Sequence, residues 1–215
     1  MTKKAETIIN VLNEMFPNAK AELNHKNPFE LLVAVVLSAQ TTDIQVNKVT
    51  ENLFKKYPSP KALSEGEIRD IENHLKSIGL YRNKAKFIKE LATILVANYN
   101  SEVPSNRSDL ESLPGVGRKT ANVVLSNAFG IPAFAVDTHV SRVSKRLGIA
   151  KPEDNVEIVE QKLNKMFPKE YWLKLHHQLI FFGRYHCLAK SPKCYECPLY
   201  DMCVFEEKAK FRARR

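Results

Sequence analysis

The chain has 215 residues, of which 44% are hydrophobic and 27% charged, a length and composition that suit one large domain or two small ones around a buried core. Its longest unbroken apolar run covers only residues 31–37, whereas a membrane-spanning helix needs about 20 residues, and residues 1–16 lack the continuous apolar segment of a signal peptide. We therefore expect a cytoplasmic protein and exclude a membrane protein. The net charge of +9 favours a polyanionic partner, with nucleic acid as the first candidate.

Apolar side chains recur at helical spacing along nearly the whole chain, and no segment has the alternation of a strand. Four such stripes are formed by Ile8, Ile9, Leu12, Met15 and Phe16; by Ile68, Ile71, Leu75 and Ile78; by Ala85, Ile88, Leu91 and Leu95; and by Trp172, Leu175, Leu179 and Phe182. The segment from Phe29 to Ala39 presents apolar side chains on all sides of a helix, which predicts a helix buried at the centre of a bundle. We expect an all-α fold of at least eight helices.

Glycines mark the expected ends of several of these helices, and a basic tail follows the last of them. Gly79, Gly130 and Gly148 stand where helices are expected to end, as is typical of C-terminal caps. No Pro-rich or Ser-rich spacer separates two halves, so the best candidates for domain boundaries are residues 18–27 and 130–135. The tail of residues 208–215 is expected to be frayed rather than folded.

A turn with two glycines joins two expected helices near the middle of the chain. Residues 108–111 have the spacing of a capping box and predict a short helix that Pro114 and Gly115 end. A second helix is expected from Arg118 to Ala128, and the free N–H groups at its start would offer a seat for a phosphate. A tight connection whose glycines only supply positive φ explains the spacing about equally well. The basic net charge favours the phosphate seat.

Two charged residues near this turn have structural as well as chemical explanations. Lys119 follows Arg118 in the first turn of the second helix, where two positive influences disfavour its ammonium form and favour the neutral amine that Schiff-base chemistry needs. From the residues alone, a contact with a DNA phosphate explains this lysine better. Asp137 precedes a helix expected over residues 138–147 and is explained as its N-cap, although a carboxylate also serves glycosidic cleavage.

The four cysteines of the chain, Cys187, Cys194, Cys197 and Cys203, all lie after residue 186. In a reducing compartment, four clustered thiols favour a metal over disulfides. Tetrahedral zinc usually takes two close pairs of the C-x2-C kind, and only Cys194 and Cys197 form such a pair. The uneven spacing therefore favours a [4Fe–4S] cluster modestly over zinc.

The residues 113–125, LPGVGRKTANVVL, resemble the helix-hairpin-helix motif of the base-excision DNA glycosylases. Together with VDTH at 136–139 and the cysteine spacing, they resemble the iron–sulfur branch of that superfamily, the endonuclease III family. The resemblance covers nearly the whole chain, from the buried helix near Phe29 to Cys203. It implies main-chain binding of DNA phosphates by the hairpin and identifies these DNA-binding residues: Gly115, Val116, Gly117, Arg118 and His139.

The resemblance assigns the chemistry to two residues. Lys119 matches the family's catalytic lysine, whose amine attacks the sugar of a flipped nucleotide and releases the damaged base. The resulting Schiff base permits elimination of the 3′ phosphate, which makes one protein both a glycosylase and an AP lyase. Asp137 matches the family's catalytic aspartate, and we expect it to cap its helix as well.

Two further DNA-contacting positions follow from the resemblance. Gln40 matches the glutamine that enters the space left by the flipped base, and Leu80 matches the leucine that wedges beside the orphaned base. Without the resemblance, Gln40 is explained as a cap of the buried helix and Leu80 as a staple between a helix end and the core. The adenine-mismatch glycosylases are excluded because residues 31–42 contain no carboxylate and Lys119 is present.

The implied fold has two lobes, with DNA crossing the cleft between them and Lys119 facing Asp137. One lobe is a six-helix barrel over residues 21–132 that contains the hairpin, and the other is a helical domain of residues 1–20 and 133–215 with a [4Fe–4S] cluster on the four cysteines of 187–203. The expected activity is the removal of oxidised pyrimidines from duplex DNA that contains damaged bases or abasic sites, by a nucleoid-associated monomer. A non-catalytic DNA-binding module and a zinc-containing nucleic-acid binder are the alternatives.

Overall fold

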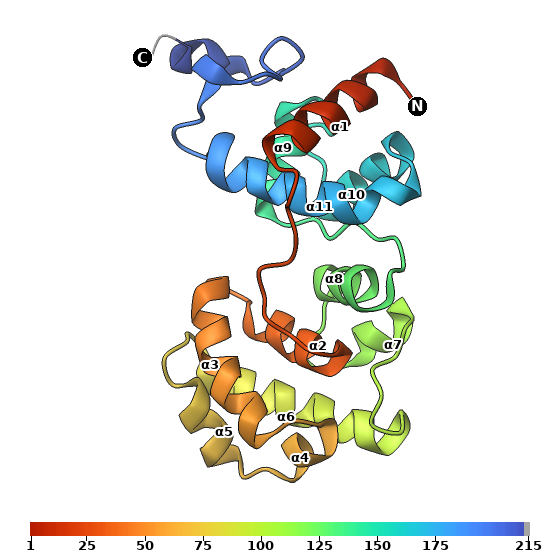
Figure 1. Ribbon diagram of the computed structural model, residues 1–215, viewed down its shortest axis with the longest axis vertical. Coiled ribbons are helices and arrows are strands. Elements are labelled where there is room, and N and C mark those ends of the chain that lie inside the picture. Colours follow the sequence, from red (N-terminus) through yellow and green to blue (C-terminus); the bar gives the residue numbers. More distant parts are fainter. Residues whose placement is uncertain (213–215) are drawn as a thin grey trace. The chain divides into compact units, whose positions relative to one another are not determined.

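In the computed structural model, residues 1–212 are described, and every regular element among them is a helix (Figure 1). The α-helices are α1 (Lys3–Met15), α2 (Pro28–Leu37), α3 (Asp43–Lys56), α4 (Pro60–Glu65), α5 (Ile68–Leu75), α6 (Tyr81–Asn98), α7 (Arg107–Ser112), α8 (Arg118–Phe129), α9 (Thr138–Arg146), α10 (Val156–Met166) and α11 (Trp172–Phe181). A π-helical turn, Phe182–His186, extends α11, and 3₁₀-helices lie at Lys169–Tyr171, Cys194–Glu196 and Glu206–Phe211. The all-α fold is confirmed, and none of the described helices is long and apolar enough to cross a membrane.

The chain divides into two compact units. Residues 21–131 form one, the hairpin unit, which contains α2 to α8. Residues 1–20 join the described chain from Pro132 onward to form the other, the cysteine unit, which contains α1 and α9 to α11.

The hairpin unit is built around α2. Asn27 caps this helix by accepting a hydrogen bond from the Glu30 N–H at 2.9 Å, and Pro28 occupies its first position. Every residue of α2 after Pro28 is buried, and the helix packs against α3, α6 and α8. The expected central helix is therefore confirmed, and its aliphatic side chains supply the core on which the neighbouring helices rest.

Two of the three glycines expected at helix ends adopt positive φ. Gly130 has a φ of 65° after α8, and Gly148 has a φ of 64° after α9. Gly79 does not, and the prediction for it is wrong: the left-handed residue is Leu80, with a φ of 57°, which is the N-cap of α6. The turn after α5 closes with the Ile78 N–H donating to the Leu75 carbonyl, and the left-handed residue follows two positions later at Leu80.

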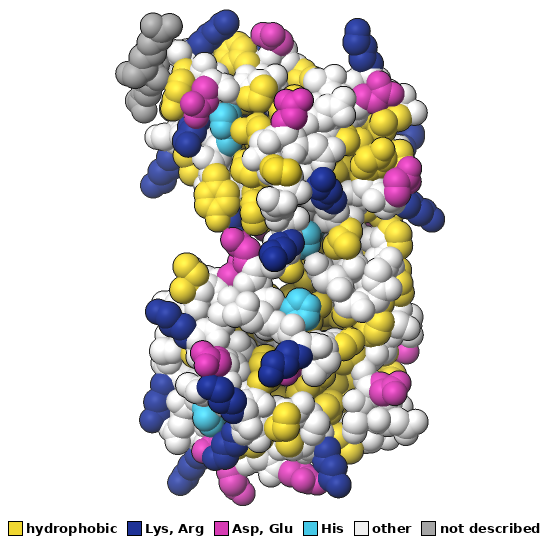
Figure 2. All heavy atoms as spheres, viewed as in Figure 1, with side chains coloured by type: hydrophobic (Ala, Val, Ile, Leu, Met, Phe, Trp, Pro, Cys, Tyr) yellow, Lys and Arg dark blue, Asp and Glu magenta, His cyan; other side chains and the backbone are white. Residues whose placement is uncertain are grey.

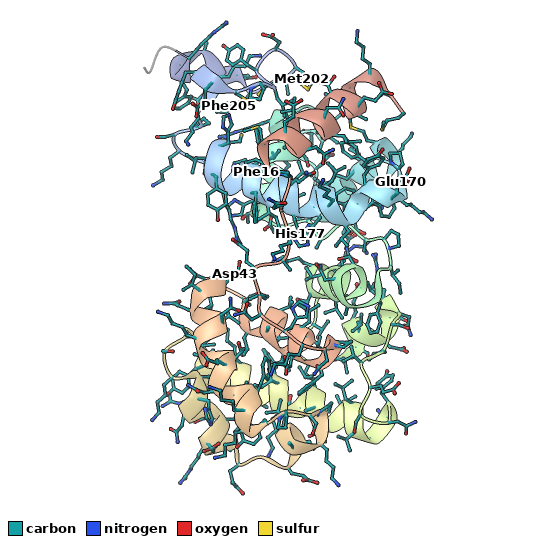
Figure 3. The ribbon with its side chains drawn as sticks, viewed as in Figure 1. Phe16, Asp43, Glu170, His177, Met202 and Phe205 are labelled. Atoms are coloured by element: carbon teal, nitrogen blue, oxygen red, sulfur yellow. The ribbon has the colours of Figure 1, made fainter. Side chains whose placement is uncertain are left out.

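The cysteine unit joins segments from the two ends of the chain. The amide of Gln178 on α11 donates to the carbonyls of Leu12 and Phe16, each at 3.2 Å, and thereby ties α11 to α1. The Phe16 ring meets the rings of Phe181 and Phe182 edge-on, at centroid distances of 6.1 and 6.5 Å (Figure 3). The apolar stripe of α1 thus packs against α11, a helix that comes much later in the sequence.

The basic C-terminal segment is folded as far as it is described. Glu206–Phe211 is a 3₁₀-helix, and Lys208 donates to the carbonyl of Tyr200 at 2.9 Å. The guanidinium of Arg212 lies 4.5 Å from the centre of the Tyr200 ring. The prediction of a frayed tail is wrong for residues 208–212 because these cations stack on an aromatic ring and bind backbone carbonyls; residues 213–215 lie outside the described part of the chain.

Candidate functional site

The hairpin of α7 and α8 begins two residues before the expected capping box. Asn106, not Ser108, caps α7: its side-chain oxygen accepts from the Asp109 N–H at 3.0 Å, and its amide donates to the Asp109 carboxylate at 2.7 Å. The Ser108 hydroxyl only donates to the Asn106 side chain. Asn106 satisfies a backbone donor and a carboxylate at once, which explains why the helix starts there.

The two glycines of the turn serve different purposes. Gly115 has a φ of +77°, and a Cβ there would lie 3.1 Å from Val36 Cγ1 and 3.2 Å from Phe87 Cβ, so both conformation and space require glycine. Gly117 has a φ of −97°, and a Cβ there would meet no described atom within 4 Å. Between them, Val116 is buried, with only 6% of the residue exposed.

The N-terminus of α8 is open. Gly117 is its N-cap, no side chain within residues 1–212 caps it, and its first turn holds no acidic residue. Arg118 and Lys119 occupy that turn, and the Lys119 side chain is exposed. Uncapped N–H groups, the positive end of the helix dipole and two cations meet here, as a phosphate-binding turn requires.

Gln40 and Leu80 are both exposed residues with left-handed backbone. Gln40 has a φ of 55° in the turn that links α2 to α3, and no hydrogen bond of its side chain is present within the described chain. Leu80 has a φ of 57° and is 59% exposed. Neither the capping explanation for Gln40 nor the stapling explanation for Leu80 therefore holds, because neither side chain makes the contact that would be needed.

Asp137 and His139 lie at the start of α9 in the cysteine unit. The expected cap is confirmed: Asp137 Oδ1 accepts from the Val140 N–H at 2.8 Å. Its second carboxylate oxygen accepts no hydrogen bond from the described residues, and the side chain is half-buried. His139 Nδ1 lies 3.4 Å from an Arg142 guanidinium nitrogen.

Two arginines one helical turn apart on α9 hold the segment that carries the first cysteine. Arg142 donates to the carbonyls of Gly183 at 2.8 Å and Cys187 at 3.1 Å, and burial lowers its pKa from the ordinary arginine value. Arg146 donates to the Leu188 carbonyl at 2.7 Å and lies 3.4 Å from Cys187 Sγ. Neither arginine was predicted from the sequence; the available signal was a pair of cations at i and i+4 on the helix that Asp137 begins.

The four cysteines converge on one pocket that is partly open to solvent. All four line it, together with apolar and aromatic side chains that include Leu147, Phe182 and Phe205. Met202 and Phe205, labelled in Figure 3, belong to the segment that closes around the cysteines. The expected clustering of the thiols is thus present in the fold.

The donor set of this pocket fits an iron–sulfur cluster better than zinc. Only Cys194 and Cys197 form a close pair of the C-x2-C kind, whereas tetrahedral zinc usually takes two such pairs. His186 lines the pocket, and its buried Nε2 has no hydrogen-bond partner in the described chain, so a group bound there would meet an unpaired polar atom. Burial raises the pKa of the Cys197 thiol to about 11, which means that four thiolates need a positively charged core between them.

The site residues fall into two groups. The hairpin unit contains the hairpin residues Gly115, Val116, Gly117, Arg118 and Lys119, and also Gln40 and Leu80. The cysteine unit contains Asp137, His139, Cys187, Cys194, Cys197 and Cys203. On the face of the molecule seen in Figure 2, basic and acidic side chains are interspersed within each unit. Charge alone therefore does not single out one part of this face.

Comparisons with known proteins agree with this geometry. Residues 33–169 match the family model of the HhH-GPD superfamily of base excision DNA repair proteins, and residues 187–203 match the iron–sulfur binding domain of endonuclease III. The chain is 56% identical to endonuclease III of Bacillus subtilis (strain 168) over 201 residues, 94% of this chain and 92% of the relative. The chain belongs to the endonuclease III family. It is therefore a DNA glycosylase of base excision repair.

Other members and solved structures extend the match. Endonuclease III of Escherichia coli (strain K12) is 49% identical over 201 residues, which cover 94% of this chain and 95% of that protein. The structure of a trapped endonuclease III–DNA covalent intermediate has a TM-score of 0.91 and 54% identity, with 98% of this chain and 99% of that chain covered. A thermostable thymine-DNA glycosylase has a TM-score of 0.87 at 26% identity, with 96% and 98% covered. The endonuclease III fold is thus shared along almost the whole chain.

Proposed function

We propose that this member of the endonuclease III family is a bifunctional glycosylase and AP lyase that removes oxidised pyrimidines from duplex DNA, with Lys119 as its nucleophile. The observation that carries the proposal is the exposed Lys119 amine in the first turn of α8, beside uncapped N–H groups and the open side of Gly117. A phosphate on those N–H groups would bring the adjoining sugar within reach of the amine.

The lysine chemistry has two steps. The neutral Lys119 amine attacks the anomeric carbon of the flipped nucleotide, a C–N bond to the enzyme forms, and the bond to the base breaks. The base leaves with the bonding electron pair and takes up a proton. The sugar ring opens to a Schiff base, whose neighbouring carbon loses a proton, and the 3′ phosphate departs with the electron pair of its C–O bond.

Asp137 is the proposed partner of this reaction. Its Oδ1 is committed to the cap of α9, and its Oδ2 is left to stabilise positive charge at the sugar or to accept the proton of the attacking amine. His139, two residues later, and the hairpin residues Gly115 to Arg118 are the proposed DNA contacts, with Gln40 and Leu80 filling the space that base flipping opens.

The proposed cofactor is a [4Fe–4S] cluster on Cys187, Cys194, Cys197 and Cys203. When bound, the cluster supplies a rigid, positively charged core that the four thiolates share. The Arg142 and Arg146 side chains then connect this segment to α9, the helix that Asp137 begins. We assign the cluster no step of the reaction.

We propose residues 21–132 as the barrel domain and residues 1–20 and 133–215 as the cluster domain, a boundary one residue beyond the end of the hairpin unit. The enzyme would act as a monomer at the nucleoid in the cytoplasm, because one hairpin and one nucleophile suffice for one lesion.

The test is incision of a duplex that contains one thymine glycol. We expect the protein to release the base and to cut the strand 3′ to the site, and Lys119→Gln to lose at least about a thousandfold in rate while DNA binding is largely kept. Lys86→Gln, an exposed lysine on α6, is the matched control and keeps full activity. Base release without strand cleavage by the wild type would contradict the bifunctional mechanism, and binding without base release would leave a non-catalytic DNA-binding module.

A further inference from the structure

Lys84 is a buried charge in the hairpin unit that the proposed mechanism does not use. It lies in the first turn of α6, and the residue is only 4% exposed. No carboxylate among residues 1–212 pairs with it, and burial lowers its pKa from the ordinary lysine value. Because burying a cation without a counter-ion is unfavourable, the position needs a compensating purpose.

The ammonium of Lys84 binds the turn that carries Gln40. Lys84 Nζ donates to Thr41 Oγ1 at 2.6 Å, and that hydroxyl in turn lies 3.4 Å from the Ala39 carbonyl, to which it donates. The turn is closed by the Thr41 N–H donating to the Ser38 carbonyl, which places Gln40 third in the turn with a φ of 55°. Glycine or asparagine is usual at such a position, so Gln40 needs the surrounding contacts to hold its conformation.

The same helix begins at Leu80, the second exposed residue with left-handed backbone. The Lys84 N–H donates to the Leu80 carbonyl at 3.0 Å, which fixes Leu80 to the first turn of α6. Leu80 is 59% exposed and therefore gains little from packing in return for an unfavourable φ. One lysine thus contacts both segments, through its backbone at Leu80 and through its side chain at Thr41.

The next turn of α6 reaches the hairpin. Leu80, Lys84 and Phe87 follow the i, i+4, i+7 spacing of one helix face. A Cβ on Gly115 would lie 3.2 Å from Phe87 Cβ, so the Gly115 backbone packs directly on Phe87. Asp43, labelled in Figure 3, marks the first turn of α3, directly after the Gln40 turn. The first two turns of α6 are therefore in contact with all three proposed DNA-contacting segments of the hairpin unit.

We propose that Lys84 is a positioning residue, which fixes the Gln40 turn to the Leu80 turn so that both side chains enter the duplex together. The inference rests on the proposed roles of Gln40 and Leu80. Lys84 contacts neither the base nor the sugar in this proposal; it acts through Thr41. It keeps two strained turns in one arrangement before DNA binds. This lowers the entropy cost of ordering the two turns when their side chains insert.

The test measures insertion separately from chemistry. The duplex carries a tetrahydrofuran abasic analogue opposite 2-aminopurine, whose fluorescence reports how its stacking changes as the enzyme inserts. In stopped flow, Lys84→Met and Thr41→Val are expected to slow insertion by about tenfold, the size expected for losing one hydrogen bond to a charged group. Thr41→Ser, which keeps the hydroxyl, and Lys86→Met, which removes an exposed charge from the same helix, keep the wild-type rate.

Two measurements separate positioning from simple stabilisation. Lys84→Met should melt no lower than wild type, because methionine fills similar volume without burying a charge. In the double variant with Gln40→Ala, the loss from Lys84→Met should largely disappear, because it acts through the Gln40 turn. Two results would overturn the proposal. One is a wild-type insertion rate for Lys84→Met. The other is a slower insertion rate that Thr41→Ser shows as well and that accompanies a lowered melting temperature.

This result is independent of whether the proposed reaction occurs. Insertion at the analogue needs no Schiff base, so it reports on Lys84 even if a thymine glycol duplex releases no base. Failure of base release alone contradicts the proposed function. Failure of Lys84→Met to slow insertion, while Gln40→Ala and Leu80→Ala do slow it, contradicts only the role of Lys84.

Discussion

The hairpin unit and the cysteine unit hold their proposed site residues by different means. In the hairpin unit, the aliphatic helix α2 is buried almost throughout, and the Gly115 turn lies directly on Val36 and Phe87. In the cysteine unit, α9 is tied to the cysteine segment through Arg142 and Arg146, and the interior contains buried histidines. The hairpin rests on apolar packing, whereas α9 combines buried aliphatic residues, Val140 and Val143, with charged contacts to the cysteine segment.

The two units should differ in how their stability depends on pH and on the cofactor. Apolar packing is little affected by pH or by the loss of a cofactor. The arginine–carbonyl contacts around the cysteines depend on whether the iron–sulfur cluster is bound. The stability contributed by buried neutral histidines depends on pH. The proposed nucleophile and its partner carboxylate should therefore fail under different treatments.

Removing a cluster ligand should have the largest effect. In Cys197→Ser, we expect the visible absorption of the cluster to be lost and the cysteine unit to lose several kcal/mol of stability, because cofactor binding contributes directly to folding. Hydrogen exchange should accelerate in α9 and in residues 182–212 but not in α2 or α8. The control Tyr195→Ser changes an exposed residue of the same loop that does not line the pocket. Equal loosening of both units would refute the contrast.

A change of pH should act on the cysteine unit next. Burial lowers the pKa of His177 on α11 from 6.5 to about 4, so the folded state stays neutral where the unfolded chain binds a proton. This contribution to the free energy of unfolding is complete above pH 6.5 and is lost as the pH falls towards 4, by up to about 3 kcal/mol.

Chemical denaturation at several pH values in this window measures the slope. His177, labelled in Figure 3, is replaced in His177→Gln, which should show a shallower decline than wild type because glutamine does not titrate. Comparing the two proteins at each pH cancels any loss that both share. Identical slopes would show that His177 is not the group responsible.

In the hairpin unit, Gly115→Ala should cost about 2 kcal/mol, since an alanine at positive φ is strained and its Cβ would press on Val36 and Phe87. DNA affinity should fall with it because the turn must shift. Urea unfolding and fluorescence anisotropy with a duplex measure the two effects. A variant of unchanged stability would mean that the turn is not fixed by this packing.

Gly117→Ala should have the smallest effect on folding and yet weaken DNA binding. Its φ of −97° suits alanine and its Cβ would meet open space, so the stability cost should stay below about 1 kcal/mol. The methyl group would stand where a phosphate is proposed to bind. The same two measurements apply, and unchanged affinity would place the phosphate elsewhere.

Helical periodicity and residue spacing predicted much of the fold and several features of the candidate site. The segment from Phe29 to Ala39, apolar on all sides, predicted the buried α2, and the position of Asp137 directly before an expected helix predicted its cap on α9. Both signals are local, because a helix face and an N-cap are set by residues within a few positions. The clustering of the cysteines was equally visible in their spacing.

Features set by contacts across the fold were not predictable in this way. The left-handed residue is Leu80 rather than Gly79, and its unfavourable backbone is set by the turn and by α6 rather than by residue preference. The pairing of Lys84 with Thr41 joins residues 43 positions apart, and Arg142 reaches Cys187 across 45. Helical periodicity does not record such contacts, because each joins a helix residue to a residue outside any helix that lies far away in the sequence.

Borohydride trapping tests the central claim most directly. The protein is mixed with a duplex containing one thymine glycol, reduced with borohydride, and the adduct is digested and mapped by mass spectrometry. We predict a covalent adduct whose sugar remnant lies on Lys119, and no adduct with Lys119→Gln, since reduction fixes the Schiff base at the attacking amine. An adduct on another residue, or no adduct from a wild-type protein that binds the duplex and releases the base, would contradict Lys119 as the nucleophile.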